Sequence, residues 1–234
     1  MTMNLFSLPP DVCRNEEGRS CCGWRAIEDA HEVALKLGIQ HLVADFRPEF
    51  EATVVHDFCT EYSRGRTPNP CIRCNEHIKF DLFLKRAARL GADLIATGHH
   101  SRITQGRRGG LYHLRKGKDQ AKDQSYFLYT LTQDQLRHVL MPVGGLTKRE
   151  VREEARKRRL KVAVKPESQE VCFVSRGRYP DFLRERIPGA FQPGLICDLD
   201  GLALGEHQGI IHFTIGQRRG LRLASSRPHY VLSI

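Results

Sequence analysis

The chain of 234 residues carries 37 lysine and arginine residues against 27 acidic ones, a formal net charge of +10. This length suits one large domain or one domain and a smaller module, and the charge favours nucleic acid over a membrane surface as partner. No apolar run reaches the roughly 18 residues of a membrane span, and the start lacks a signal-peptide pattern. Because the 8 cysteines are irregularly spaced, working thiols in a reducing cytoplasm are expected rather than a disulfide scaffold.

Strand and helix patterns alternate along the first part of the chain. Met1–Phe6 has the pattern of a strand end, and a helix is predicted over Trp24–Leu37. A strand over Ile39–Phe46 and a helix over Phe50–Tyr62 follow, and a short apolar strand is predicted later, over Asp93–Thr97. This alternation predicts an α/β layer with a parallel sheet.

The segment Gly65–Asn75 (GRTPNPCIRCN) is the most informative stretch. Pro68 and Pro70 hold the backbone extended, because proline fixes φ and keeps its predecessor out of the helical region. A helix pattern begins at Asn75, so Cys74 is predicted to lie in the first turn of a helix. The partial positive charge there favours a thiolate, which makes a reactive sulfur plausible.

Cys71 and Cys74 form a C-x-x-C motif, which zinc sites and redox sites share. A structural zinc site usually has a second pair at similar spacing. No such pair is formed by Cys13, Cys21, Cys22, Cys59 and Cys172. Redox or nucleophilic chemistry is the favoured interpretation, with zinc binding and inert packing left open.

The strand predicted over Asp93–Thr97 ends in the sequence Thr-Gly-His-His. Ligands gather at the carboxyl ends of strands in open α/β sheets, and Gly98 would let a ligand approach the backbone. His99 beside it could donate a hydrogen bond or handle a proton. An ordinary tight turn is the alternative.

Further elements are predicted in the second half of the chain. They are a strand over Leu111–Arg115, a short helix ending over Leu136–Met141, a helix through Leu160 capped by Thr147 with Glu150, and a short helix over Arg178–Arg186. The capped helix is rich in basic residues, for which a solvated face is favoured over a dedicated nucleic-acid surface. From Gln192, regularly placed glycines indicate a small β module. The predicted division is an α/β region over 1–193 and the start of a β domain over 194–234.

Several segments in collinear order closely resemble the tRNA-specific 2-thiouridylase family: GRTPNPCIRCNEHIKF, ATGHH, KDQSYFLY, ESQEVCFV and LGEHQG…FTIGQRRGL. The resemblance implies an adenine nucleotide alpha hydrolase-like (PP-loop ATPase) fold, a parallel sheet with helices, followed by a small β module. It implies a tRNA-uridine 2-sulfurtransferase that adenylates the wobble uridine with Mg-bound ATP. Sulfur from a cysteine persulfide then gives 2-thiouridine.

The resemblance also assigns site residues. Cys74 matches the family's nucleophile, and Cys172 matches the cysteine that carries the persulfide. Asn69, Pro70 and Cys71 match the segment that meets the target base. Since the family admits an acid at the position of Cys71, no structural metal is expected at the C-x-x-C motif.

Nucleotide and tRNA contacts carry over in the same way. Gly98 matches a nucleotide-contacting glycine, and Met3 aligns with a residue near the adenine. His99 lies beside Gly98 and is assigned to contact with the tRNA substrate. A tRNA-contacting element is matched by Lys122, Asp123 and Gln124. The implied partners are tRNA and a sulfur donor protein, either a cysteine desulfurase or a sulfur carrier, with no membrane.

The family's Ser-Gly-Gly-x-Asp-Ser phosphate loop and its C-terminal β-barrel have no match in this sequence. Backbone amides of that loop hold pyrophosphate, so the chain is expected to be incomplete at both ends and inactive alone. The alternatives are a catalytically inactive RNA-binding remnant of the family and, less favoured, a metal-binding C-x-x-C protein.

Overall fold

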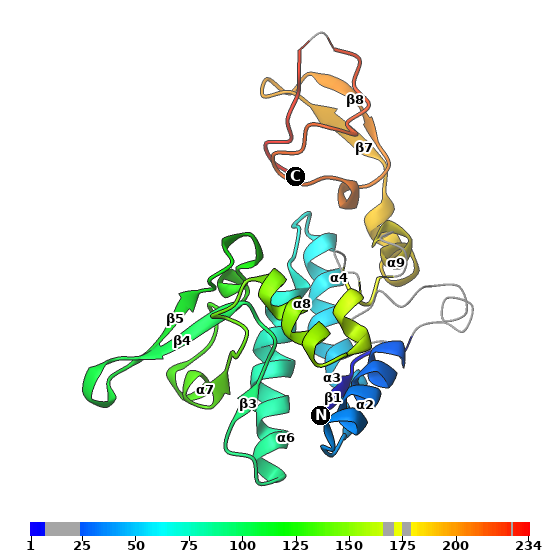
Figure 1. The fold of residues 1–234 in the computed structure, drawn as a ribbon. Helices are drawn as coiled ribbons and strands as arrows, with labels where there is room; N and C mark the ends of the chain where they lie inside the picture. The colour runs from blue at the N-terminus through cyan, green and yellow to red at the C-terminus, as the bar shows by residue number, and fades with distance from the viewer. Residues whose placement is uncertain (8–23, 166–170, 175–178, 226) are drawn as a thin grey trace. The chain divides into compact units, whose positions relative to one another are not determined.

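The computed structural model describes residues 1–7, 24–165, 171–174, 179–225 and 227–234. They form two compact units, shown in Figure 1 and described separately. The first unit contains Met1–Val54 and Cys71–Cys172, and the second contains Val55–Pro70 and Phe173–Ile234. Each unit therefore combines two stretches that are distant in the sequence.

Parallel strand pairs form the frame of the first unit. β1 (Thr2–Asn4) pairs with β2 (Val43–Asp45), and β3 (Ile95–Ala96) pairs with β6 (Val139–Leu140). Parallel neighbours need crossover connections, and helices lie between the paired strands along the chain. The predicted α/β class with parallel pairing is confirmed, although β2 covers only three residues of the strand predicted over Ile39–Phe46.

One predicted helix is wrong in its extent. α7 (Gln133–Arg137) includes only the first two residues of Leu136–Met141, which was expected to form the end of a short helix, and β6 follows it. Buried Leu136 and Val139 are three residues apart, which is helical spacing. Val139 nevertheless pairs with Ile95, so a strand contact distant in the sequence outweighs the local pattern.

Helical segments make up most of the remaining structure. The first unit contains α2 (Trp24–Leu37), α3 (Arg47–Phe50), α5 (Pro70–Arg73), a π-helical segment (Cys74–Leu82), α6 (Phe83–Arg89) and α8 (Lys148–Lys157), α5 beginning at the last residue of the second unit. A π-helical segment over Glu51–Val55 connects α3 to α4 (His56–Ser63). The bounds of α2 match its prediction, and the Thr147–Glu150 capping box that begins α8 is confirmed.

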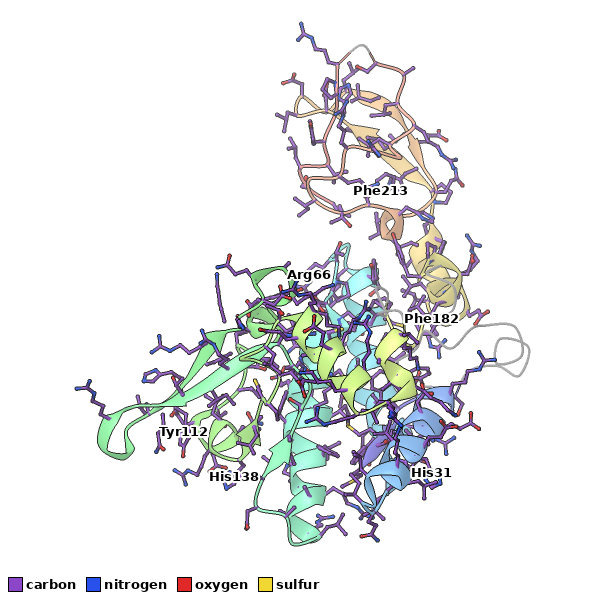
Figure 2. The ribbon with its side chains drawn as sticks, viewed as in Figure 1. His31, Arg66, Tyr112, His138, Phe182 and Phe213 are labelled. Carbon is purple, nitrogen blue, oxygen red and sulfur yellow. The ribbon has the colours of Figure 1, made fainter. Side chains whose placement is uncertain are left out.

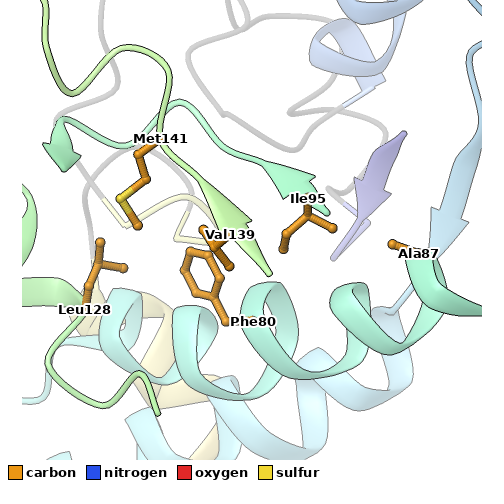
Figure 3. Packing of buried hydrophobic residues seen from close by; sticks show 6 residues of the cluster. All are labelled: Phe80, Ala87, Ile95, Leu128, Val139 and Met141. Carbon is orange, nitrogen blue, oxygen red and sulfur yellow. The ribbon is translucent and has the colours of Figure 1, made fainter. Parts of the chain in front are cut away.

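A hydrophobic cluster joins the helices to the strands of the first unit. Figure 3 shows its members lying between α6, the π-helical turns before it, and the strands β3 and β6. The buried members are Phe80, Ala87, Ile95, Leu128, Val139 and Met141. Burial of a side chain the size of phenylalanine contributes about 1.5–3 kcal/mol. The cluster therefore holds the end of β3, where the Thr-Gly-His-His segment begins.

A hairpin extends from this frame. β4 (Ser101–Gln105), which the sequence did not predict, pairs with β5 (Tyr112–Lys116) in antiparallel register. Tyr112 is marked in Figure 2, and its N–H and C=O each bond the Gln133 side chain at 2.8 Å. These bonds attach the hairpin to the start of α7.

The second unit combines helices with a small sheet. α9 (Tyr179–Arg186) contributes Phe182, whose ring lies 5.3 Å from Phe173 and 6.2 Å from Phe58 of α4. β7 (Gly194–Cys197) and β8 (Ala203–His207) pair in antiparallel fashion, as expected for the start of a β module.

No helix within the described ranges is long and apolar enough to cross a membrane.

Candidate functional site

The environment of Cys74 differs from the prediction. Helical turns begin at Pro70, a residue suited to the first helical position, so Cys74 follows the first turn instead of lying in it. The predicted location in the first turn is therefore wrong. Cys71 lies there and is exposed, whereas Cys74 is only 7% exposed. Because the helix dipole weakens beyond the first turn, it acts on Cys71 more than on Cys74.

Asn75, next to Cys74, is a buried polar residue that the sequence did not single out. It is 1% exposed, and its Nδ2 donates to the carbonyl oxygen of Phe127 at 3.2 Å. Its Oδ1 is buried with no hydrogen-bond partner in the described structure. The Asn75 amide thus attaches the helical run after Cys74 to a distant turn.

Cys172 belongs to the first unit, as Cys74 does. Cys172 is half-buried and lies in a turn, and Phe173 and Val174 directly after it are buried. The part of the ESQEVCFV motif at residues 167–170 lies outside the described residues. The structure thus places both predicted catalytic cysteines in one unit.

The carboxyl end of β3 has open space beside its backbone. A Cβ built on Gly98 meets no atom within 4 Å, and Gly98 is exposed. Another group could therefore approach the backbone at Gly98 closely, and the contact of Gly98 with a nucleotide stays a prediction. Met3 is half-buried in β1, on the other strand pair, and its contact with adenine stays a prediction.

His99 is buried directly after Gly98. Its Nδ1 lies 2.9 Å from Thr97 Oγ1, and its ring lies 5.6 Å from that of Phe80. Burial, with the nearby positive charges of Lys79 and His100, lowers the pKa of His99 to about 3. His99 is therefore a neutral imidazole at pH 7, which suits an orienting hydrogen-bond group better than a proton carrier.

The predicted tRNA-contacting residues 122–124, here called the KDQ element, differ in exposure. Lys122 is exposed, whereas Asp123 and Gln124 are half-buried. Asp123 Oδ1 accepts from Gly117 N–H at 2.8 Å, and its Oδ2 accepts from the Ser125 hydroxyl at 2.7 Å. Burial raises the pKa of Asp123, but these hydrogen bonds outweigh it and the pKa is lowered overall.

The remaining predicted base-contacting residues lie in the second unit. Asn69 is exposed and Pro70 is buried. In the residues that the structure describes, no group of three or more histidine, cysteine, aspartate or glutamate side chains could hold a metal ion.

By its fold, the chain is an α/β protein with parallel strand pairs, followed along the sequence by a small β module. The model of the tRNA methyl transferase HUP domain matches residues 3–176, and that of the tRNA methyl transferase PRC-barrel domain matches residues 180–234. The predicted division after residue 193 stays a prediction. Together with the relatives below, these matches show that the chain belongs to the tRNA-specific 2-thiouridylase (MnmA) family.

Curated relatives named tRNA-specific 2-thiouridylase MnmA match nearly the whole chain. The protein from Carboxydothermus hydrogenoformans is 52% identical over 234 residues, which is 100% of this chain and 64% of the relative. The protein from Geobacter metallireducens is 49% identical over 229 residues, 98% of this chain and 61% of the relative. The chain thus spans less than two thirds of the length of these relatives.

Proposed function

We propose that the chain is the catalytic part of a tRNA-uridine 2-sulfurtransferase. The observation that carries the proposal is that Cys74 and Cys172 fall in one unit, within the span of the HUP-domain match. The proposal is supported by relatives named 2-thiouridylases, which this chain resembles over nearly its whole length. The proposed substrates are tRNA and Mg-bound ATP, and the proposed sulfur source is a cysteine desulfurase or sulfur carrier in the cytoplasm.

The proposed reaction solves a leaving-group problem. Oxygen O2 of uridine is a poor leaving group, so attack by O2 on the α-phosphorus of ATP releases pyrophosphate and prepares AMP as the group that departs from carbon 2. The terminal sulfur of a Cys172 persulfide, a strong nucleophile at neutral pH, then attacks carbon 2 and AMP leaves. Attack by Cys74 on the Cys172 sulfur breaks the remaining S–S bond. The products are 2-thiouridine and a Cys74–Cys172 disulfide, which an external thiol must reduce.

Other residues have positioning roles in this proposal. Open space at Gly98 would admit the nucleotide, and neutral His99 would orient a substrate oxygen by a hydrogen bond. Lys122 would contact tRNA phosphate, and Asn69 with Cys71 would meet the target base.

The test places this chain in a complete enzyme. The matched span of the Carboxydothermus relative is replaced by the chain, and 2-thiouridine in tRNA is measured by nucleoside mass spectrometry with ATP, Mg²⁺ and a sulfur donor. We expect Cys172→Ser to abolish thiolation and Cys74→Ser nearly to do so. Cys71→Asp should be tolerated, and the exposed Cys197→Ser serves as the matched control.

The competing interpretations predict other results. Stoichiometric zinc in the chimera, with thiolation lost in Cys71→Asp, would establish a C-x-x-C metal site and refute the assignment of Cys74. An RNA-binding remnant would bind tRNA in the chimera while giving no 2-thiouridine. The net charge of +10 agrees with both the enzyme and the remnant, so product formation separates them.

A further inference from the structure

The segment after Gly98 is held by a residue that the family resemblance assigns to tRNA contact. The Gln124 N–H donates to the carbonyl oxygen of His100 at 3.1 Å, and Gln124 Oε1 accepts from the His100 N–H at 2.9 Å. The amide side chain thus completes a two-way pairing with the backbone of His100. The side-chain oxygen of Gln124 is therefore used inside the protein rather than presented to a ligand.

The loop that carries Gln124 is itself attached to the start of α8. Asp119 Oδ2 accepts from the Lys148 N–H at 2.9 Å, and Lys118 Nζ lies 2.7 Å from Glu150 Oε1. The hydrogen bonds of Asp123 to Gly117 N–H and Ser125 close the turn between these attachments. The loop is consequently a defined structure in the unit, and only part of it, including Lys122, is exposed.

Glycines allow two other segments to approach the same backbone. A Cβ on Gly117 would lie 2.4 Å from the His100 carbonyl oxygen, and a Cβ on Gly144 would lie 1.7 Å from that of Ser101. Neither distance leaves room for a side chain, so both positions require glycine for close packing. His100 and Ser101 are therefore surrounded by the loop at Gly117, by Gln124 and by the turn at Gly144.

We propose that Gln124 is a positioning residue. It couples the protein loop of residues 117–125, which carries Lys122, to the carboxyl end of β3 at Gly98 and His99. The inference rests on the proposed function, because it takes Lys122 as a tRNA contact and Gly98 with His99 as substrate contacts. Binding of tRNA phosphate at Lys122 would further stabilise the loop in this position, and the Gln124–His100 pairing would in turn stabilise the backbone of His100 and His99. Coupling between two ligands is reciprocal, so a bound nucleotide would strengthen tRNA binding by the same factor.

Two substitutions at the same position separate positioning from direct tRNA contact. Gln124→Ala removes the acceptor for His100, whereas Gln124→Glu retains an oxygen acceptor and adds a negative charge. If Gln124 acted by touching tRNA, the added charge would make glutamate the more harmful change, because it repels phosphate. If it acts by positioning, glutamate should resemble the wild type. Gln120→Ala, at an exposed glutamine of the same loop, is the control.

The first measurement is hydrogen exchange of the His100 amide in the 234-residue chain without ligand. We expect exchange about fivefold faster in Gln124→Ala, the effect of one lost hydrogen bond, and near wild-type exchange in Gln124→Glu and Gln120→Ala. Unchanged exchange in Gln124→Ala would overturn the positioning role. Equal acceleration in Gln124→Glu would do the same, because the acceptor would then not be the cause.

The second measurement adds an unmodified tRNA transcript at saturating concentration. Protection of the His100 amide should rise in the wild type and in Gln120→Ala, but not in Gln124→Ala at equal occupancy. A rise of equal size in Gln124→Ala would overturn the coupling while leaving the proposed function intact. Failure of the wild-type chain to bind tRNA at low salt would overturn the coupling and count against the chain's role in tRNA modification as well.

Discussion

At the scale of single residues, the predicted site residue His99 and Asn75, which follows Cys74, are both buried polar side chains, but their polar atoms are satisfied differently. His99 bonds Thr97 and is kept neutral by burial and by neighbouring positive charge. Asn75 uses its donor on Phe127, while its acceptor has no hydrogen-bond partner in the described structure. A buried polar group without its bonds costs free energy, so both residues should have measurable effects on stability.

Stability should fall in mild acid because of His99. Its pKa is about 3 in the folded chain and near 6.5 when unfolded, so between these values the unfolded state binds more protons. The contribution is full above pH 6.5 and is lost as the pH falls, at about 1.4 kcal/mol per pH unit. Between pH 7.5 and pH 5.5, the free energy of unfolding measured in urea should fall in the wild type by about 1.4 kcal/mol more than in His99→Gln.

That comparison must be between variants, because other groups titrate in the same direction. Burial also lowers the pKa of His41 and of His212, with smaller contributions from nearby positive charge. Their effects cancel in the difference between wild type and His99→Gln. Equal pH dependence in the two proteins would show that His99 titrates normally.

Removing the Asn75 amide should destabilise the first unit. Asn75→Ala leaves the Phe127 carbonyl without this donor and opens a small cavity, which costs about 1–3 kcal/mol. Asn75→Asp should cost at least as much, because it replaces the donor with a buried negative charge. Urea denaturation measures both, with exposed Gln40→Ala as the amide control. Wild-type stability in Asn75→Asp would argue that the site is open to water.

At the scale of elements, the start of α8 was predicted correctly because a local capping box defines it. The Thr147 hydroxyl accepts from the Glu150 N–H at 3.2 Å, and the Glu150 carboxylate accepts from the Thr147 N–H. Lys118 also donates a hydrogen bond to the Glu150 carboxylate, and this bond is the main reason why the pKa of Glu150 is lowered to about 2. The capping residue Glu150 of α8 is therefore also bonded to the loop that carries the KDQ element.

Loss of this cap should weaken α8. Thr147→Ala removes the acceptor for the Glu150 N–H and is expected to cost about 1 kcal/mol of unfolding free energy. Thr147→Ser keeps a hydroxyl and should be nearly neutral. Denaturant unfolding of the three proteins checks this, and a Thr147→Ala variant as stable as Thr147→Ser would mean that the helix start is held by its tertiary contacts alone.

At the scale of the whole molecule, the excess of basic residues should govern tRNA binding. With a net charge of +10, most of the affinity is expected from phosphate contacts, and each contact contributes about −0.7 to −0.9 to the slope of log K against log salt. Lys122→Ala should flatten that slope by about one contact. The matched control is Lys85→Ala, a lysine of α6 that pairs with Asp81. A slope near zero would contradict the electrostatic account.

Local patterns in the sequence by themselves determined the helix over Trp24–Leu37, the cap at Thr147 and the alternation that defines an α/β class. They also identified the family, because its motifs are short runs of contiguous residues in a fixed order. Such features depend on neighbours within a few positions, and the physical forces behind them act over the same range.

Only the tertiary structure decided the features that depend on distant partners. The short strand β6 forms because Val139 pairs with Ile95 of β3. Asn75 is buried where its side chain donates a hydrogen bond to the carbonyl oxygen of Phe127. Gln124 appears in the sequence as one polar residue in a basic loop, and its pairing with His100 requires the folded chain. Hydrogen bonds and packing between residues far apart in the sequence carry no local pattern, so the sequence alone could not assign them.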